Sequence, residues 1–279
     1  MRTKRRRARR RRTAGRKARP DQCGLSDMQI EVSVLSNPGG RERNEDACGF
    51  WTGGGGCFCV VSDGAGGHGG GDIASKLAVR MILSSFQDAP ACTGPAIDAA
   101  LRAAHAAIVS QQGVLERSAA MRATATVLAI DTVHRTAVWG HVGDTRLYCF
   151  RAGRVIAQTK DHSVVQKMVD AGYLAQNALR ESAQRSRLFA ALGHDEDFVS
   201  TVAAAPFVIE GGDVFLLCTD GFWEYIDEAA MAEALAGTDS PAEWLRRMEQ
   251  DVVRNGREGQ DNFSAVAVWC TETAPASSR

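Results

Sequence analysis

The sequence predicts an α+β protein, in which a central antiparallel β-sandwich is flanked by helices on both sides in four αββα layers. Runs of strand length outnumber helical patterns, and most are joined by short loops containing Gly, Asp or Asn, which favours antiparallel pairing. Helical patterns fall in pairs between groups of strands, so helices can cover the outer faces of two packed sheets.

Runs of apolar or alternating residues are expected to form the strands of these sheets. They lie at Gln29–Leu35, Ala47–Trp51, Cys57–Ser62, Ala125–Asp131, Ala137–Val142, Arg146–Arg151, Val214–Thr219 and Phe263–Cys270. The segments DTVHRTA (131–137) and FRAGRV (150–155) are typical of hairpin turns between neighbouring strands.

Helices are expected where apolar residues recur every three or four positions, at Ile73, Leu77 and Met81, and again at Ile97, Leu101, Ala104 and Ile108. The segment HSVVQKMVDAG predicts a helix that ends near Gly172. The clearest helix follows Ser240, the expected N-cap, with Pro241 in the first turn and Glu243 closing a capping box. Gln176–Ser200 has little periodicity and is expected to form a mobile loop or flap.

Charge is distributed unevenly along the chain. Residues 1–20 hold 12 Lys and Arg and no acid, which leaves 21 of the 33 basic residues against all 33 acidic ones in the remainder. An acidic body suits divalent cations better than nucleic acid. We expect a disordered Arg-rich arm over 1–27, one domain over 28–271 and a flexible tail over 272–279. Three interpretations of the arm stay open: a solvated tail, sequence upstream of a start at Met28, or a contact to nucleic acid or an anionic surface.

Composition also indicates the compartment. No stretch approaches the roughly 18 consecutive apolar residues that a membrane span needs. The eight cysteines are scattered and form no CxxC pair, which favours a reducing cytoplasm.

The stretch VVSDGAGGHGGGD (60–72) joins an expected strand to an expected helix. Gly64, Gly66 and Gly69 satisfy the GxGxxG pattern of dinucleotide-binding turns, and Asp88 lies 19 residues beyond them. Two objections count against that function. The charge of Asp63, directly before the first glycine, would repel a pyrophosphate, and the following segments do not supply a parallel βαβ unit.

Asp63 is one of several acids at the ends of apolar strands, the others being Glu45, Asp46, Asp144, Asp220 and Asp261. A single acid beside a strand is usually a turn residue, whereas strands that assemble side by side would gather the whole set. Such a cluster repels itself unless cations neutralise it, and oxygen ligands select Mg²⁺ or Mn²⁺. The backbone carbonyl of Gly64 can serve as a further ligand.

Six motifs now identify a resemblance. They are RERNEDA (41–47), VSDGAGGH (61–68), VGDTRLY (142–148), KDHSVVQ (160–166), LLCTDGFWEY (216–225) and GQDNFSAVAV (259–268). In this order, over roughly residues 30–270, they resemble the motif series of the protein phosphatase 2C family, bacterial type, which are metal-dependent Ser/Thr phosphatases. The family fold, a β-sandwich flanked by helices, agrees with the expected architecture.

The resemblance implies hydrolysis of phosphoserine and phosphothreonine in proteins by a water that bridges two divalent metals, Mn²⁺ or Mg²⁺. Asp63 would bridge both metals and the Gly64 carbonyl would ligate one. Asp220 and Asp261 would complete the shell of the other, and Asp144 would join Asp220 at a weaker third metal.

Further roles follow from the same resemblance. Glu45 and Asp46 would hold metal-bound waters, and Arg41 would bind the phosphoryl group; Arg41, Asp46 and Asp63 are the expected catalytic residues. The proton donor stays open, because Ala65 stands where eukaryotic members have a His. His68 matches the bacterial form, either as that donor or as a residue that stabilises the turn.

One departure from the family pattern is the segment MRATATV (121–127), where relatives commonly have GTT or GST. Thr126 fits the Thr position and the glycine is missing, so a local backbone adjustment is expected. The alternative function is a pseudophosphatase that binds phosphoproteins without hydrolysing them. The expected partners are phosphorylated proteins, the substrates of a bacterial Ser/Thr kinase, and the expected state is a monomer.

Overall fold

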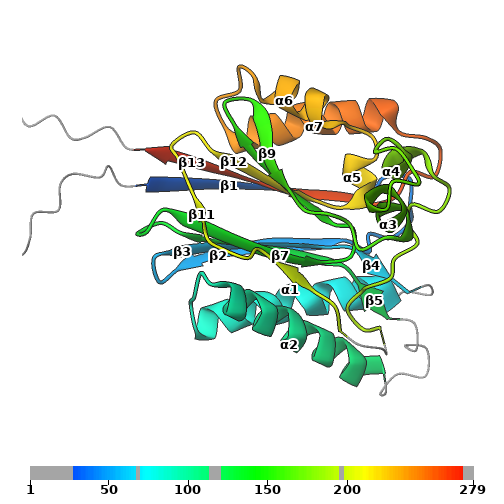
Figure 1. The fold of residues 1–279 in the computed structure, drawn as a ribbon, viewed down its shortest axis with the longest axis horizontal. Helices are drawn as coiled ribbons and strands as arrows, with labels where there is room; N and C mark the ends of the chain where they lie inside the picture. Colours follow the sequence, from blue (N-terminus) through cyan, green and yellow to red (C-terminus); the bar gives the residue numbers. More distant parts are fainter. Residues whose placement is uncertain (1–27, 67–69, 113–120, 195–197, 273–279) are drawn as a thin grey trace, which may run out of the picture.

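Two antiparallel sheets pack face to face, and helices cover the outer face of each (Figure 1). The computed structural model describes residues 28–66, 70–112, 121–194 and 198–272. The expected arm (1–27), His68 and the tail beyond residue 272 lie outside the described residues. Among the described residues, none of the helices combines the length and hydropathy that a membrane span requires.

The five-stranded sheet combines the first and last strands of the domain with three strands from the middle of the chain. Its strands are, in spatial order, β1 (Met28–Asn37), β13 (Phe263–Glu272), β12 (Val214–Cys218), β8 (Arg146–Arg151) and β9 (Arg154–Gln158). The first strand pairs with the last along their whole length, from Met28 opposite Glu272 to Asn37 opposite Phe263. This pairing closes the domain and extends the last strand two residues beyond its predicted end.

The second sheet contains the strand that leads into the glycine-rich segment, one position in from its edge. Its strands are β10 (Thr201–Val202), β7 (Thr136–Val142), β6 (Ala125–Asp131), β3 (Gly56–Ser62) and β2 (Ala47–Gly53), with β11 (Phe207–Val208) also paired to β7. Every residue of β3 is buried, because a helical layer covers one face and the other sheet covers the opposite face. A separate short ladder joins β4 (Gly64–Ala65) to β5 (Arg122–Ala123).

The longer helices of the described residues form the outer layers (Figure 1). The helices α1 (Gly70–Asp88) and α2 (Gly94–Gln112) cover the second sheet, and α6 (Glu228–Leu235) and α7 (Pro241–Asn255) cover the first. Aromatic contacts show both layers packing: Phe58 stacks on Phe86 at 4.4 Å, and Trp244 meets Phe150 edge-on at 5.4 Å. Three short helices, α3 (Val164–Asp170), α4 (Ala178–Glu181) and α5 (Asp220–Trp223), lie at one end of the sandwich.

The predicted fold class and main strands are confirmed, with two corrections in detail. Asp220 begins a short helix directly after its strand, which therefore ends at Cys218 instead of Thr219. The capping box of α7 is only half formed: the Ser240 side chain accepts the Glu243 N–H at 3.2 Å, but the Glu243 carboxylate lies 2.8 Å from Arg247 instead of returning to Ser240. A cation one turn along the helix competes successfully for that carboxylate.

Candidate active site

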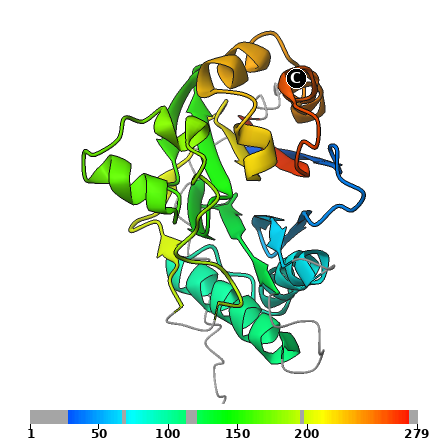
Figure 2. The same cartoon turned by 90° about the vertical axis from the view of Figure 1, so that its right-hand side faces the viewer.

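The register of the antiparallel strands gathers the predicted carboxylates at one end of the sandwich. The start of β2 pairs with the end of β3, so Asp46, before β2, lies near Asp63, after β3. In the other sheet the end of β12 pairs with the start of both β8 and β13, which brings Asp220, Asp144 and Asp261 to the same end. Figure 2 looks onto this end, where segments from all along the chain converge.

A cavity of about 370 Å³ opens there. Its wall includes the Arg41 side chain, the Gly64 turn and a set of carboxylates: Glu45, Asp63, Asp144, Asp220 and Asp261. Asp46 is not part of that wall. Its side chain is buried, with the residue 5% exposed.

The Arg41 turn is fastened to the Asp261 loop. Arg41 Nη2 lies 3.1 Å from Asp261 Oδ2, and both side chains are about half exposed at the mouth of the cavity. Asn262 holds the two segments together, because its Oδ1 accepts the Glu45 N–H at 2.7 Å and its Nδ2 donates to the carbonyls of Pro38 and Arg43. This amide fixes the backbone that carries Arg41 and Glu45.

Asp46 is held from the opposite sheet. Its Oδ2 accepts a hydrogen bond of 2.9 Å from Thr219 Oγ1, and the same hydroxyl accepts the Ser264 N–H at 2.9 Å. The other oxygen, Asp46 Oδ1, is buried and has no hydrogen-bond partner among the described residues. A buried carboxylate oxygen without a partner is uncommon and marks a place for a further polar group or an ion.

The glycines around Asp63 permit a close approach between a strand end and a helix start. A Cβ on Gly64 would lie 2.0 Å from the Gly71 carbonyl oxygen, and one on Gly71 would lie 2.5 Å from Glu45 Oε2. Thr124 fixes the backbone of Asp63 by accepting its N–H at 3.0 Å and donating its own N–H to the Asp63 carbonyl at 2.8 Å. The glycine-rich turn therefore packs tightly behind the Asp63 carboxylate.

The backbone of Asp144 is held by a buried network of contacts among Trp223, Arg146 and Asp161. Trp223 Nε1 donates to the Asp144 carbonyl at 3.0 Å, and the Arg146 guanidinium stacks on the Trp223 ring at 3.5 Å. Arg146 is buried and makes two hydrogen bonds of 2.8 Å to the buried carboxylate of Asp161. Since Trp223 is in the short helix that Asp220 begins, this network connects the positions of Asp144 and Asp220.

Burial and mutual repulsion shift the ionisation of these acids. Burial raises the pKa of Asp63 well above its usual range, and the nearby charge of Asp46 raises it further. The pKa values of Asp144 and Asp220 are raised in the same way, by burial first and then by a neighbouring carboxylate. Burial also raises the pKa of Asp46 to about 7.

These residues fit a divalent cation by their chemistry. Among the described residues, no group of three or more His, Cys, Asp or Glu side chains is arranged so that it could hold a metal ion. The carboxylates of the wall are hard oxygen donors, the buried Asp46 Oδ1 has no partner among the described residues, and the acids repel one another, which together match the needs of Mg²⁺ or Mn²⁺.

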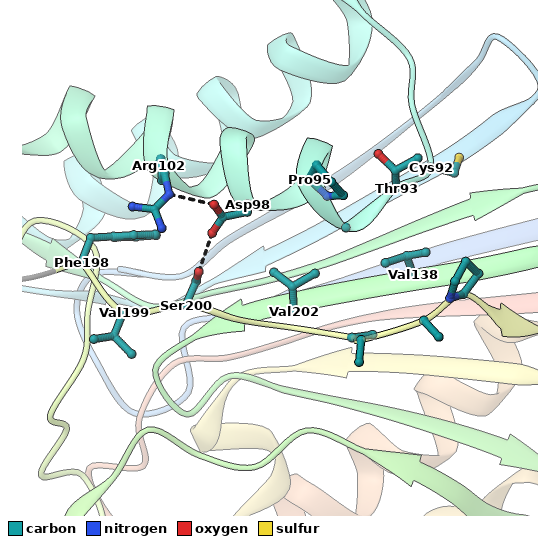
Figure 3. A pocket seen from close by; sticks show the side chains of 15 residues that line it. Cys92, Thr93, Pro95, Asp98, Arg102, Val138, Phe198, Val199, Ser200 and Val202 are labelled. Carbon is teal, nitrogen blue, oxygen red and sulfur yellow. Dashed lines mark hydrogen bonds and ion pairs between the residues drawn. The ribbon is translucent and has the colours of Figure 1, made fainter.

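A second cavity, of about 730 Å³, lies between the start of α2 and residues 198–206 (Figure 3). Its charged side chains are already paired: Asp98 binds Arg102 at 2.7 Å and accepts from Ser200 at 2.7 Å. The hydrogen bond from Arg102 is the main cause of a lowered pKa at Asp98, and burial raises the pKa of the Cys92 thiol to about 12. This cavity therefore presents neither a free acid nor a reactive thiolate.

The sheet topology excludes the alternative that the glycine-rich turn binds a dinucleotide. The strand β3, which ends directly before Asp63, has antiparallel neighbours on both sides, which excludes a parallel βαβ unit. Asp88, the acid that the pattern would assign to a ribose, is the exposed last residue of α1.

Comparison with known proteins agrees with this geometry. A family model described as Protein phosphatase 2C matches residues 39–256. The serine/threonine protein phosphatase PstP of Mycobacterium tuberculosis is 32% identical over 228 residues, 81% of this chain, and the chain spans only 42% of that relative's length. Protein phosphatase PhpP of Streptococcus pneumoniae is 27% identical over 252 residues, 87% of this chain and 98% of its own.

A solved structure extends the agreement to three dimensions. The crystal structure of the catalytic domain of PstP in complex with 2 manganese ions superposes with a TM-score of 0.74 at 27% identity, and covers 88% of this chain and 100% of that one. The relative from Mycobacterium tuberculosis is named as a serine/threonine protein phosphatase and the one from Streptococcus pneumoniae as a protein phosphatase, and the chain belongs to the protein phosphatase 2C family.

Proposed function

We propose that this protein hydrolyses phosphoserine and phosphothreonine in other proteins, with two divalent cations in the carboxylate cavity. The observation that carries the proposal is the convergence of the cavity carboxylates with Arg41 at the mouth. Bound Mn²⁺ or Mg²⁺ would supply an attacking water of lowered pKa and neutralise the charge that develops on the phosphoryl oxygens.

The chain's own residues divide into two groups. Asp63, the Gly64 carbonyl, Asp220 and Asp261 would hold the two cations, and Asp144 would share a third, weaker one with Asp220. Glu45 and Asp46 would hold the waters around them. Asp46 suits that role because Thr219 already satisfies one of its oxygens and leaves the other available.

Arg41 would bind the substrate's phosphoryl group. Its guanidinium lies at the mouth of the cavity and is half exposed, so an incoming dianion can reach it. A planar guanidinium donates two parallel hydrogen bonds to phosphoryl oxygens, which a lysine cannot do. Its ion pair with Asp261 is equally exposed and therefore weak, so the substrate can displace it.

The partners that this function requires are phosphorylated proteins, of the kind that a bacterial Ser/Thr kinase produces. The relatives from Mycobacterium tuberculosis and Streptococcus pneumoniae are both named as protein phosphatases, which supports that substrate class. We propose that the domain over 28–271 acts as a monomer, since all the residues assigned above come from one chain.

Hydrolysis of p-nitrophenyl phosphate and of a phosphothreonine peptide tests the proposal. We expect turnover with Mn²⁺ that is abolished by EDTA and falls at least about a hundredfold in Asp220→Asn, because removal of a ligand charge weakens cation binding. Asp88→Asn is the matched control, since it changes an exposed acid at the end of α1, and should keep full activity. Binding of the phosphopeptide without turnover in Mn²⁺ would establish the pseudophosphatase alternative instead.

A further inference from the structure

Arg122 is a charged residue of the cavity wall that the assigned chemistry does not use. It lies in β5, is exposed, and forms no ion pair or side-chain hydrogen bond with any residue in the described part of the chain. The other arginine of the wall, Arg41, is paired with Asp261. An unpaired guanidinium beside a cavity lined by acids is available to an anionic group on a ligand.

The backbone around Arg122 is fixed on both sides. On one side Ala65 of β4 is its partner in the short ladder. On the other side Ala123 forms a two-bond bridge with Leu192, at 3.1 and 2.7 Å, which places residues 192–193 against the same segment. The Gln112 side chain donates at 2.6 Å to the Met121 carbonyl and thereby fastens the residue before Arg122.

The Arg122 side chain lines the cavity, and the residues next to it, Ala65 and Gly193, are small. Ala123, the next residue of the strand, is buried, so Arg122 lies on the opposite, exposed face. Its cross-strand partner is Ala65, and a glycine at 193 follows the bridging Leu192. Cross-strand partners lie within about 5 Å of each other, so a larger residue at 65 would occupy the space over which the guanidinium extends.

We propose that Arg122 is a specificity-determining residue, which binds an anionic group next to the phosphorylated Ser or Thr of the substrate. This inference rests on the proposed phosphatase function. The phosphoryl group itself would be held by Arg41 and the divalent metals. The Arg122 guanidinium, on the adjoining wall, would therefore bind a different anionic group of the same substrate. A carboxylate of Asp or Glu and a second phosphoryl group share the required chemistry.

Three phosphothreonine peptides distinguish these sources: one with neutral flanking residues, one with flanking Glu, and one with a second phosphothreonine. For the wild type with Mn²⁺ we expect kcat/KM to be about three- to tenfold higher on an anionic peptide than on the neutral one, mainly through KM. Arg122→Gln should abolish this preference and Arg122→Lys should retain part of it. Arg154→Gln, which removes an exposed arginine of β9 that has no ion pair among the described residues, should retain all of it.

Two results would contradict this inference without contradicting the proposed function. One is an unchanged preference for anionic peptides in Arg122→Gln. The other is a loss on p-nitrophenyl phosphate as large as the loss on the anionic peptides, which would place Arg122 at the phosphoryl group. Failure of the wild type to hydrolyse any of these substrates would instead contradict the proposed function, and the inference with it. Preference for the doubly phosphorylated peptide over the Glu peptide would identify a second phosphoryl group as the anion.

Discussion

Thr219 Oγ1 donates a hydrogen bond of 2.9 Å to Asp46 Oδ2, and this bond joins the two sheets at the end where the cavity opens. Thr219 follows β12 in one sheet, and Asp46 precedes β2 in the other. The hydroxyl also accepts the Ser264 N–H, so it connects three chain segments. A buried carboxylate thus receives its orientation from a residue directly beside Asp220.

Replacement of Thr219 by Val tests this connection. Valine keeps the shape but leaves Asp46 Oδ2 and the Ser264 N–H without this partner, and buried groups that lose a partner cost about 1–3 kcal/mol each. We expect Thr219→Val to lower the free energy of unfolding by about 2–4 kcal/mol in urea titration. Thr219→Ser retains the hydroxyl and should cost clearly less. A Thr219→Val variant as stable as the wild type would show that these two hydrogen bonds contribute little to stability.

The raised pKa values of the acids in and behind the cavity wall predict how stability changes with pH in metal-free protein. Burial raises the pKa of Asp46 to about 7, and raises those of Asp63 and Asp220 well above their usual range. The folded state then binds more protons than the unfolded chain above about pH 4, so stability falls as pH rises. Each group contributes at most about 1.4 kcal/mol per pH unit.

The comparison is best made between about pH 6.5 and 8, because buried histidines act in the opposite direction at lower pH. Burial lowers the pKa of His162 to about 3 and also lowers that of His141, so both stabilise the fold as pH rises towards about 6.5. In EDTA, we expect Tm to fall from pH 6.5 to 8. Mn²⁺ should raise Tm more at pH 8, where the acids are ionised. A Tm in EDTA that rises over this range would contradict the prediction.

The sequence predicted the layers and the acids of the cavity, because both follow from local patterns. Continuous apolar runs or runs of period two mark the strands, and each acid stands next to such a run. The residues that hold the acids were not predicted. Asn262 contacts Glu45 across 217 positions and Thr219 contacts Asp46 across 173, and no local pattern encodes such distant hydrogen bonds.

Contacts between distant segments also explain why the sequence did not predict two short strands. The strands at Gly64–Ala65 and Arg122–Ala123 are two residues long, too short to leave a periodic signal, and exist because tertiary packing brings them together. In the segment MRATATV, the sequence places Thr126 at the threonine position of the family pattern. The structure shows that two threonines of this segment make contacts near the cavity. Thr126 donates to the Thr145 carbonyl at 2.5 Å, and Thr124 holds the backbone of Asp63.

The buried pair of Arg146 and Asp161 predicts an asymmetric response to mutation. Arg146→Met leaves the Asp161 carboxylate buried without its two hydrogen bonds, and should lower the free energy of unfolding by about 3–5 kcal/mol. The double variant Arg146→Met/Asp161→Leu removes both charges and should recover much of that loss. Arg102→Met breaks a largely exposed pair with Asp98 and should cost less than about 1 kcal/mol.

Urea titration of these variants decides between two functions of the pair. A double variant as unstable as Arg146→Met would show that the stacking of Arg146 on Trp223, not the charge pair, stabilises this region. Activity offers a second readout, since Trp223 donates to the Asp144 carbonyl. A double variant that is stable but poorly active would indicate that the network orients the cavity acids.

Gly64 should tolerate no side chain, because of close packing and not because of its backbone angles. A Cβ at this position would lie 2.0 Å from the Gly71 carbonyl oxygen and 2.7 Å from that of Glu45, and backbone atoms in a strand end and a helix start cannot both retreat. We expect Gly64→Ala to displace the Asp63 turn, to destabilise the protein by several kcal/mol and to abolish hydrolysis of p-nitrophenyl phosphate. Gly94→Ala is the matched control, since its nearest neighbour is Cγ1 of the Val202 side chain at 3.3 Å, which can rotate away. Full activity in Gly64→Ala would show that the close approach of these two segments is not required to position the carboxylates.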